Sequence, residues 1–491
     1  MYLNVISKIS DFIDKINGNI LSPIMMIFIL GTGILLTIRL RCLQITYFGH
    51  SIGETIVPSV KSVFVKNETD KKKGAVSQFQ AFSAAIAGTV GTGNIVGVST
   101  ALCLGGPGAI FWMWFSAFFG MLTNFSENVL GIYYRKKDEN GEYHGGAMYY
   151  ITHGLGWKWL AIMFSAFCVL ASIGYNMAQV NSISSTLESS INIPLLVTGI
   201  IVAIIVFLVI IGGIKRIGKI ASYIVPIMAL IFIFLAIIII CMNITAIPDA
   251  FSRIFTEAFS FKSFGSGIMG YGILRGMRYG VARGVFSNEA GLGSSVMAHC
   301  ASDVKEPVKQ GLWGIFEVFL DTFVICTLMA LVFMTSGAYD HFLAGILDKG
   351  APMALWAFEE NLGLIGKIAF TLILPLFAFT TVLSWEYYGE CGASYLFGKK
   401  AILPFKIVYV LLVVAGATLK IDIVWNLSDS FNVLMAVPNL IGVILLSSVL
   451  KKVVLNYKER RKGNNIKPML SAYEEDNEEL IKELYTKVNV E

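Results

Sequence analysis

Two stretches of the sequence combine glycine, hydroxyl, amide and charged residues inside apolar segments that are long enough to cross a membrane. Residues 88–97 read GTVGTGNIVG, and residues 283–295 read RGVFSNEAGLGSS. Each glycine costs about 1 kcal/mol relative to alanine inside a helix, and asparagine or threonine in hydrocarbon needs a hydrogen-bond partner. Both stretches therefore predict a broken membrane-spanning helix, whose freed amides and carbonyls bind a small polar solute or an ion. The alternative for the first stretch is close helix packing.

The composition indicates a polytopic membrane protein. Of the 491 residues, 55% are hydrophobic and only 14% are charged, whereas soluble proteins carry about 25% charged residues. The seven cysteines are scattered without a CxxC pair, so neither a zinc site nor a disulfide framework is indicated. Because a span needs about 20 apolar residues, we expect an all-α fold with about eleven transmembrane helices. They lie near residues 20–40, 77–104, 108–134, 159–186, 194–213, 219–243, 266–301, 310–335, 365–392, 403–419 and 426–450.

The basic residues predict the orientation in the membrane. Most of the 38 lysines and arginines fall in alternate loops and in the C-terminal tail, and cytoplasmic loops are enriched in these residues. We therefore expect the N-terminus outside the cell membrane and the C-terminus in the cytoplasm. The pattern of Leu3, Ile6, Ile9, Phe12 and Ile16 predicts a short helix in the membrane interface.

The two broken segments stand five spans apart and divide the chain into matching halves. The predicted organisation is an interfacial segment (1–19), an extra helix (20–41), a first five-helix repeat (77–243), a second repeat inverted relative to the first (266–450) and a cytoplasmic tail (451–491). Interrupted helices at matching places in two inverted halves are typical of the binding site of a secondary transporter. This pairing favours transport over mere helix packing.

Several motifs resemble the alanine/glycine:cation symporter family, the sodium:alanine symporters. They are GTGNI (91–95), GGPGAIFWMW (105–114), GGAMYY (145–150), FSNEAGLGS (286–294) and FAFTTVLSWEYYGE (377–390). The resemblance covers about residues 15 to 450. It implies the inverted-repeat architecture of the amino acid–polyamine–organocation superfamily, preceded by one extra helix. The chain departs from the usual GGPMYY motif at Ala147, in a loop predicted to be cytoplasmic, so the departure bears on gating.

The carboxylate of an amino acid suits the positive N-terminal end of a half-helix, whose amides lack intrahelical partners. In the first break that end lies at Thr92, Gly93 and Asn94, with the Asn94 amide as a direct donor. The resemblance implies that these residues bind substrate together with Gln179 and Trp385. We expect Gln179 and backbone carbonyls freed by the second break to receive the substrate ammonium, and aromatic rings to limit the substrate's size. The residues concerned at that break are Phe286, Ser287 and Asn288, and Phe286 and Trp385 supply the rings. The alternatives are an interhelical hydrogen bond for Gln179 and ordinary packing for the rings.

Hydroxyls suit sodium, which prefers hard oxygen ligands. Thr380, Thr381 and Ser384 lie within about one helical turn of each other. In transporters of the resembled architecture such hydroxyls form a sodium site with carbonyls of the first broken helix, here near Thr89 and Val90. The alternative is that the hydroxyls bond back to their own helix.

Charged residues within the spans are candidates for gating or coupling, because a charge in the membrane interior is costly. Glu289 could titrate and couple transport to protons. Glu317 and Asp321, spaced i, i+4, could pair with Arg283 or lie on the cation route, although we favour a structural role. Glu127, Glu386 and Glu390 are interpreted as gating or interface charges near the cytoplasmic face.

The predicted function is sodium-coupled symport of alanine or glycine by alternating access. The alternatives are a proton-coupled amino acid transporter of the same fold and, less favoured, a channel. The five histidines include no HExxH or similar constellation, so we expect no enzyme activity and no cofactor besides sodium as the coupling ion. Residues 91–97 lack the GxGxxG spacing of a dinucleotide loop. We expect alanine or glycine, sodium and the lipid bilayer as partners and no nucleic acid, and the sequence makes no prediction about oligomeric state.

Overall fold

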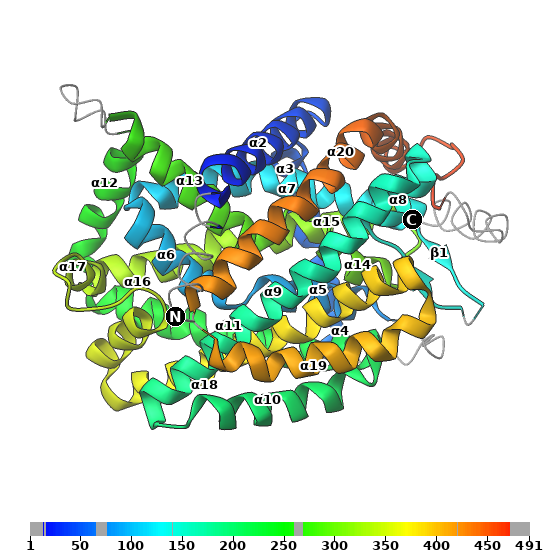
Figure 1. Ribbon diagram of the computed structural model, residues 1–491. Coiled ribbons are helices and arrows are strands. Elements are labelled where there is room, and N and C mark those ends of the chain that lie inside the picture. Colours follow the sequence, from blue (N-terminus) through cyan, green and yellow to red (C-terminus); the bar gives the residue numbers. More distant parts are fainter. Residues whose placement is uncertain are drawn as a thin grey trace.

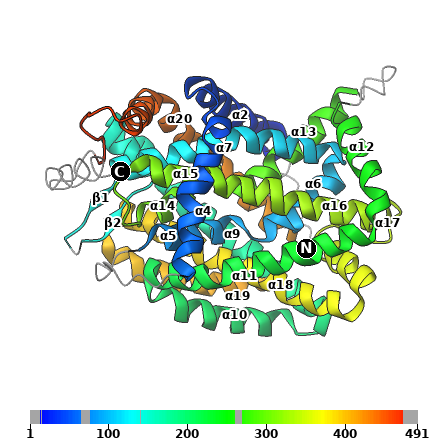
Figure 2. The ribbon, with the colours of Figure 1, turned by 180° about the vertical axis from the view of Figure 1, so that it is seen from behind.

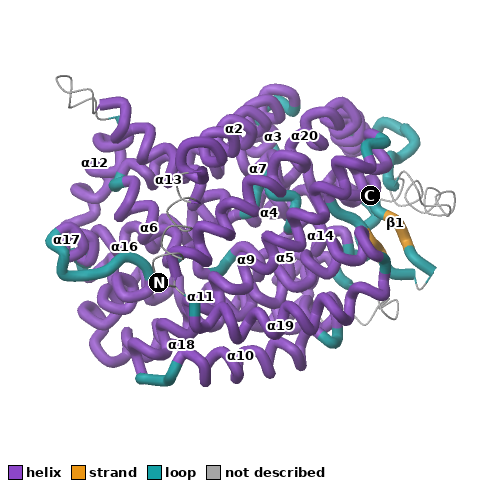
Figure 3. Tube along the Cα trace, in the orientation of Figure 1, coloured by secondary structure: helices purple, strands orange, loops and turns teal. Residues whose placement is uncertain are grey.

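The computed structural model describes residues 13, 16–64, 76–139, 141–259, 269–419 and 421–471. Within these ranges the chain is helical apart from one short hairpin and the connecting turns (Figure 3). The predicted interfacial helix of residues 1–19 lies largely outside the described residues, as does the acidic end of the predicted tail beyond residue 471.

The described residues contain eight helices that are long and apolar enough to cross a membrane. Helices α5 and α6, bent by 50° at their break, together form a ninth such segment. The shorter apolar helix α10 and the interrupted pair α13 and α14 occupy the two remaining predicted segments. Each predicted span therefore has a helical counterpart, and the protein is an all-α polytopic membrane protein. The boundaries of the predicted repeats stay a prediction.

The spanning elements follow the chain in order. They are α2 (Ser22–Arg39), α5 (Gln78–Thr89) with α6 (Val96–Gly105), α7 (Gly108–Tyr134), α9 (Lys158–Ile191), α10 (Leu195–Ile210), α11 (Gly213–Met242), α13 (Met269–Asn288) with α14 (Ser295–Cys300), α15 (Pro307–Val318) continued by η5 (Phe319–Cys326) and α16 (Thr327–Thr335), α18 (Ala351–Phe397), α19 (Ile402–Thr418) and α20 (Ile421–Arg461). The shorter elements are η1 (Asn17–Leu21), α3 (Leu43–Thr46), α4 (Phe48–Phe64), η2 (Thr92–Asn94), β1 (Lys136–Lys137), β2 (Tyr143–His144), α8 (Ala147–Tyr150), η3 (Ile151–Leu155), η4 (Ile244–Ala246), α12 (Ile247–Ala258), α17 (Ala338–Leu343) and η6 (Lys399–Ala401).

Both predicted breaks are present. Helix α5 begins with a capping box between Ser77 and Gln80 and ends at Thr89. The backbone is extended at Val90 and Gly91 before one 3₁₀ turn leads into α6. Between α13 and α14 three residues have positive φ: Glu289 (55°), Gly291 (93°) and Gly293 (73°). A helix cannot continue through this conformation, so the glycines there are required by the backbone.

Helix α9 runs through the middle of the bundle and packs against α18, α20 and α19 (Figure 1). Small residues permit the close approach. A Cβ on Gly174 of α9 would lie 3.0 Å from the backbone of Ser428 in α20, and a Cβ on Gly416 of α19 would lie 2.7 Å from the backbone of Met177 in α9. Without a hydrophobic drive between helices in lipid, such close van der Waals contact is a main source of stability.

The two ends of the bundle carry different short elements (Figure 1). One end, here called the hairpin end, holds the antiparallel pair β1 and β2. The buried Arg135 donates to the carbonyls of Cys300 and Ser302 at 3.2 and 2.6 Å, which ties the hairpin to the chain after α14. Burial raises the pKa of Asp138 in the hairpin, but hydrogen bonds from Lys399 and the Glu142 amide outweigh it and hold that pKa below its usual range. Helices α12 and α17 lie at the opposite end.

The structure adds features that the sequence analysis did not predict. Helix α4 crosses the bundle at an angle to α15, as the rear view shows (Figure 2), and its Ser51 donates to the Leu312 carbonyl at 2.8 Å. The hairpin was also not predicted. The span expected over 365–392 is part of the longer α18, which bends at Gly363 (φ 60°). That bend joins a short helix outside the predicted span to the spanning part.

Candidate functional site

The first break is held by two amide side chains. The Gly91 N–H donates to Asn94 Oδ1 at 2.9 Å, and the Thr92 N–H donates to Gln179 Oε1 at 3.1 Å. Thr92, Asn94 and Gln179 are buried, and the Thr92 hydroxyl has no hydrogen-bond partner within the described ranges. At the break these two backbone amides are therefore bonded to side chains rather than within a helix, the side-chain carbonyl of Gln179 is engaged, and one buried hydroxyl is left without a partner.

The two breaks touch each other. A Cβ on Gly93 would lie 3.1 Å from Ser287 Cα and 3.2 Å from the Phe286 ring. The Asn288 side chain donates to Thr322 Oγ1 at 3.0 Å and accepts from the Ala290 amide at 3.0 Å. Residues predicted to bind the carboxylate and the ammonium of one amino acid thus meet at a single place in the bundle.

A carboxylate from a third helix joins this place. Asp321 lies in η5, and its Oδ1 accepts from Asn94 Nδ2 at 2.6 Å and from Ser287 Oγ at 2.9 Å. The Thr322 hydroxyl donates to Asp321 Oδ2 at 2.8 Å. The Cys326 thiol lies 3.3 Å from Asn94 Nδ2. Helix turns of the π type occur often at functional sites, and here one brings Asp321 between both breaks.

The predicted sodium hydroxyls reach the first broken helix. Thr381 Oγ1 donates to the Ala87 carbonyl at 3.0 Å, and Ser384 Oγ donates to the Ala84 carbonyl at 2.7 Å. A Cβ on Gly91 would lie 2.3 Å from Thr381 Oγ1, so only glycine allows this approach. The carbonyls in contact are thus those of Ala84 and Ala87, whereas the sequence analysis expected carbonyls near Thr89 and Val90.

Thr380 follows the alternative that the sequence analysis left open. Its hydroxyl donates back to its own helix, to the carbonyls of Leu376 and Phe377 at 3.1 and 3.0 Å. The Thr89 hydroxyl likewise donates to the Ile86 carbonyl at 3.2 Å. Of the predicted hydroxyls of α18, those of Thr381 and Ser384 therefore contact helix α5, the first half of the first broken helix. Each also bonds within α18.

Four aromatic rings from four helices stack beside the breaks. Tyr175 of α9 lies between Trp385 (centroids 3.6 Å apart) and Phe286 (4.4 Å), and Phe286 in turn contacts Trp425 (4.6 Å). The Tyr175 hydroxyl donates to the Phe286 carbonyl at 3.0 Å. Phe286 and Trp385 were predicted, but Tyr175 and Trp425 were missed. The one available signal was the position of Tyr175, one helical turn before Gln179.

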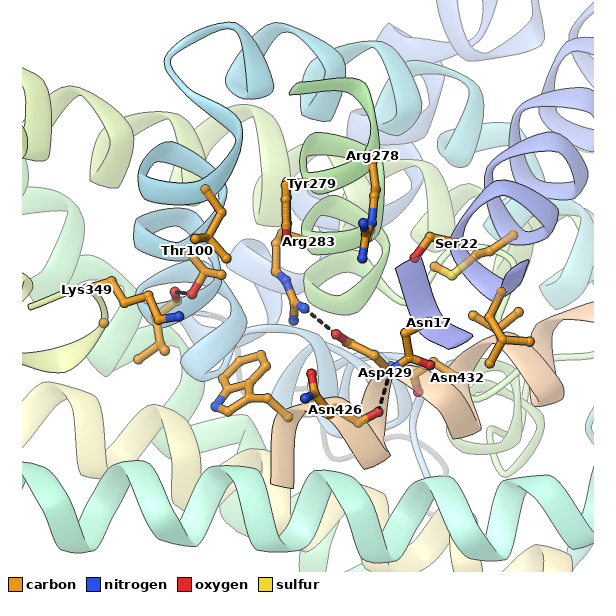
Figure 4. A pocket seen from close by; sticks show the side chains of 18 residues that line it. Asn17, Ser22, Thr100, Arg278, Tyr279, Arg283, Lys349, Asn426, Asp429 and Asn432 are labelled. Carbon is orange, nitrogen blue, oxygen red and sulfur yellow. Dashed lines mark hydrogen bonds and ion pairs between the residues drawn. The ribbon is translucent and has the colours of Figure 1, made fainter. Parts of the chain in front are cut away.

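Glu289 and Arg283 have partners that differ from those considered in the sequence analysis. Glu289 accepts from Trp385 Nε1 at 2.8 Å and from Ser294 Oγ at 2.5 Å, and it is fully buried. Arg283 forms an ion pair with Asp429 of α20, so the possible pairing with Glu317 or Asp321 that the sequence analysis considered is not found. The physical reason is position, because Arg283 lies more than a turn before the break and points toward Asp429 (Figure 4).

The Arg283–Asp429 pair lines a cavity of about 460 Å³ beside the ring stack (Figure 4). Trp425 belongs to both the cavity lining and the stack. Arg278, Lys349, Asn426 and Thr100 also line the cavity. This cavity is large enough for a small amino acid, since ligand pockets typically measure about 300–1,000 Å³.

The remaining candidate carboxylates form separate networks. Glu317 Oε2 lies 2.9 Å from His299 Nε2, and His299 Nδ1 lies 2.6 Å from Gln310 Nε2. Glu127 accepts from Asn439, which also donates to the Gly291 carbonyl at 2.9 Å. Glu390 pairs with Lys406 at 2.9 Å. Glu317 thus has a structural partner, whereas Asp321, one turn further along, faces the breaks.

The model of the sodium:alanine symporter family matches residues 6–471. The sodium/alanine symporter AgcS of Methanococcus maripaludis is 42% identical over 458 residues, which are 92% of this chain and 98% of AgcS. The probable sodium/glutamine symporter GlnT of Bacillus subtilis is 34% identical over 449 residues, covering 91% of this chain and 90% of GlnT.

A similar fold is found among solved structures. The crystal structure of MhsT in complex with L-phenylalanine matches with a TM-score of 0.55 at 15% identity, covering 78% of this chain and 98% of MhsT. At that identity the likeness concerns the fold alone. The family match over nearly the whole chain agrees with the motifs at both breaks and identifies a secondary transporter. The chain belongs to the sodium:alanine symporter family.

Proposed function

We propose that this transporter couples inward sodium flow to the uptake of a small neutral amino acid, alanine or glycine, by alternating access. The observation that carries the proposal is the contact of Thr381 and Ser384 with the carbonyls of Ala87 and Ala84. Hydroxyl and carbonyl oxygens from two different helices are the ligands that a hard cation prefers. An ion held there would draw α18 and the first broken helix together.

The substrate site of the proposal lies next to this contact. The amides that follow the first break receive the carboxylate, and carbonyls near Phe286 and Ser287 receive the ammonium. Supporting this arrangement, Gly93 lies against Ser287 and the Phe286 ring, and Phe286 stacks on Tyr175, which stacks on Trp385. A small side chain fits such a site better than a long one.

Sodium and substrate act together in this mechanism. Each ligand stabilises the closed arrangement of the breaks only to the extent that it binds that arrangement more tightly than the open one. Sodium at Thr381 and Ser384 fixes the first break, and the fixed break presents its amides to the substrate. In this mechanism the Arg283–Asp429 pair and Trp425, which line the cavity, close the site toward it.

The test is uptake of radiolabelled alanine by proteoliposomes under inward gradients of sodium, lithium, potassium or protons. The expected result is uptake driven by sodium, competed by glycine and not by leucine. Glutamine belongs among the competitors because the relative GlnT is named a probable sodium/glutamine symporter. Uptake driven only by protons would refute sodium coupling and favour the proton-coupled alternative. Alanine flux that runs down its own gradient and does not depend on any of the four cation gradients would favour a channel.

The proposed location is the cell membrane, with the hairpin end in the cytoplasm and the N-terminus outside. The support is the excess of basic residues in the loops of the hairpin end and in the tail. Cys42 is exposed beside the hairpin-end terminus of α2 and lies close to Arg39 and Arg41 in sequence. In intact cells, a membrane-impermeant maleimide is expected to leave Cys42 unlabelled, and prompt labelling of Cys42 would reverse the orientation.

A further inference from the structure

The proposed function assigns no role to the buried carboxylate of Asp321. Its side chain is completely buried, and it lies where η5 passes both breaks. The groups that bond to its carboxylate are an amide and two hydroxyls, from Asn94, Ser287 and Thr322. All three are neutral, so the hydrogen bonds orient the carboxylate without cancelling its charge.

The buried basic side chains within the described residues have other partners. Arg283 is paired with Asp429, Lys406 with Glu390 and His299 with Glu317, and Arg135 donates to the carbonyls of Cys300 and Ser302. An isolated carboxylate in a low-dielectric interior costs several kcal/mol unless a positive charge accompanies it. The described part of the protein therefore supplies no positive charge to balance Asp321, and a cation from outside could do so.

The substrate makes this charge problem larger. The proposed carboxylate position lies at the amides of Thr92, Gly93 and Asn94, and the Asn94 side chain already donates its amide hydrogens toward Asp321. A second carboxylate at the first break would meet Asp321 across a single neutral amide. Two negative charges at such short range in the membrane interior repel strongly. A cation between them removes the repulsion and joins the substrate to η5.

We propose that Asp321 binds a sodium ion, distinct from the ion held by Thr381 and Ser384, and that this second ion bridges Asp321 and the substrate carboxylate. The proposal rests on the proposed function, because it assumes that sodium is the coupling ion. Besides the carboxylate, the oxygen ligands that already contact it are the hydroxyls of Ser287 and Thr322, which need only turn their hydrogens away.

A free polar group next to η5 supports a ligand at this place independently. The Thr92 hydroxyl is fully buried and has no partner within the described ranges, and η2, which contains Thr92, packs against η5. Leaving a buried hydroxyl unpaired costs about 1–3 kcal/mol. A bound ion or its attached substrate would satisfy that hydroxyl. The ion is sodium rather than a larger cation because several small, neutral oxygen donors surround one carboxylate in a tightly packed space.

The experiment counts sodium ions on the purified protein. Equilibrium binding of radioactive sodium, with choline as the balancing cation, is measured with and without alanine, together with the sodium dependence of alanine uptake in proteoliposomes. The wild type is expected to bind about two sodium ions per chain with alanine present, with a Hill coefficient above about 1, since that coefficient can rise to the number of sites. Asp321→Asn is expected to bind about one ion and to show a Hill coefficient near 1.

Two further variants separate the two ions and control for charge. Thr381→Ala is expected to lose the other ion and to keep the one at Asp321. Glu317→Gln removes a buried carboxylate one turn before Asp321 and is expected to leave the sodium count unchanged, whatever its effect on rate. Asp321→Glu keeps the charge and is expected to keep both ions, so it remains informative if Asp321→Asn does not fold, as judged by size-exclusion chromatography.

Other outcomes decide against the inference or against the proposed function. An unchanged sodium count in Asp321→Asn, with weakened alanine binding, would mean that Asp321 binds the substrate ammonium and would overturn the inference alone. A wild-type count of one ion, retained in Asp321→Asn, would also overturn it while leaving sodium coupling intact. No sodium binding to the wild type, together with uptake driven only by protons, would overturn the proposed function itself.

Discussion

The two helix breaks hold unwound backbone in different ways. At the first, the Gly91 and Thr92 amides bond to the neutral side chains of Asn94 and Gln179. At the second, three residues with positive φ are fixed by the buried carboxylates of Glu127 and Glu289, with Asn439 and Ser294 as partners. Neutral amides can exchange one partner for a ligand at small cost, whereas buried carboxylates lose much more when a partner leaves. The first break is therefore suited to ligand exchange, whereas the second holds a fixed backbone conformation, here called the frame.

The strongest test of this comparison is Asn94→Leu. The substitution removes the acceptor for the Gly91 amide and the donor to Asp321, so both the break and its link to η5 are lost. Each unsatisfied buried group costs about 1–3 kcal/mol, and we expect alanine uptake to fall to less than about 1% of wild type. Uptake of radiolabelled alanine in proteoliposomes measures the effect, and size-exclusion chromatography establishes that the variant is folded. Wild-type uptake would refute a role for Asn94 in binding.

Much of this comparison could be predicted from the sequence. The glycines and polar residues at 88–97 and 283–295 interrupt apolar segments, so both breaks were predicted and are present. The resemblance also implied that Thr380, Thr381 and Ser384 contact carbonyls of the first broken helix; Thr381 and Ser384 do so, although the carbonyls are those of Ala87 and Ala84.

Partners across the bundle could not be predicted in the same way. Tyr175 and Trp425 are aromatic residues on apolar helices, and their sequence context resembles that of rings that simply pack. Arg283 pairs with Asp429, which lies 146 positions away, and helix spacing carries no information about such a distance. Asp321 looked like a companion of Glu317 because of their i, i+4 spacing, but the π-type turn in η5 separates their surroundings. The partners of these side chains therefore depend on tertiary contacts, which the local periodicity of the sequence does not reveal.

A smaller but still large effect is expected for Gly91→Ala. The new Cβ would lie 2.3 Å from Thr381 Oγ1, so α18 or the break must move. Overpacking of this kind costs about 1–3 kcal/mol, which corresponds to a roughly 10- to 100-fold higher sodium concentration for half-maximal uptake. Gly97→Ala is the matched control, because its Cβ would meet only Arg283 Cδ at 4.0 Å. Equal sodium dependence of the two variants would contradict the contact between the break and Thr381.

At the second break, Trp385→Phe is expected to have a moderate effect. It removes the hydrogen bond from Nε1 to Glu289 but keeps an aromatic ring against Tyr175. A hydrogen bond to a charged group contributes about 1.5–3 kcal/mol, and part of that loss is expected to raise the KM for alanine by roughly tenfold. Tyr175→Phe is the comparison, because it keeps the stack and loses the bond to the Phe286 carbonyl. If Trp385→Phe left the KM unchanged, the bond to Glu289 would have no part in ordering the site.

The smallest effect on uptake, and the one most specific to the frame, is expected for Gly291→Ala. Gly291 has a φ of 93°, where an L-residue is strained by about 1–2 kcal/mol, and its Cβ would lie 3.3 Å from the flexible Leu440 side chain and 3.5 Å from Ile29. The backbone bonds to Glu127 and Asn439 hold this conformation in place, so the strain should appear as lower thermal stability. We expect a fall in the unfolding midpoint of about 2 °C or more, with alanine KM and sodium dependence within roughly threefold of wild type. Gly53→Ala on α4 is the control, since nothing lies within 4 Å of its Cβ. If Gly291→Ala instead changed the sodium dependence as strongly as Gly91→Ala, the second break would take part in ligand exchange as directly as the first, and the division between an exchanging break and a fixed one would be wrong.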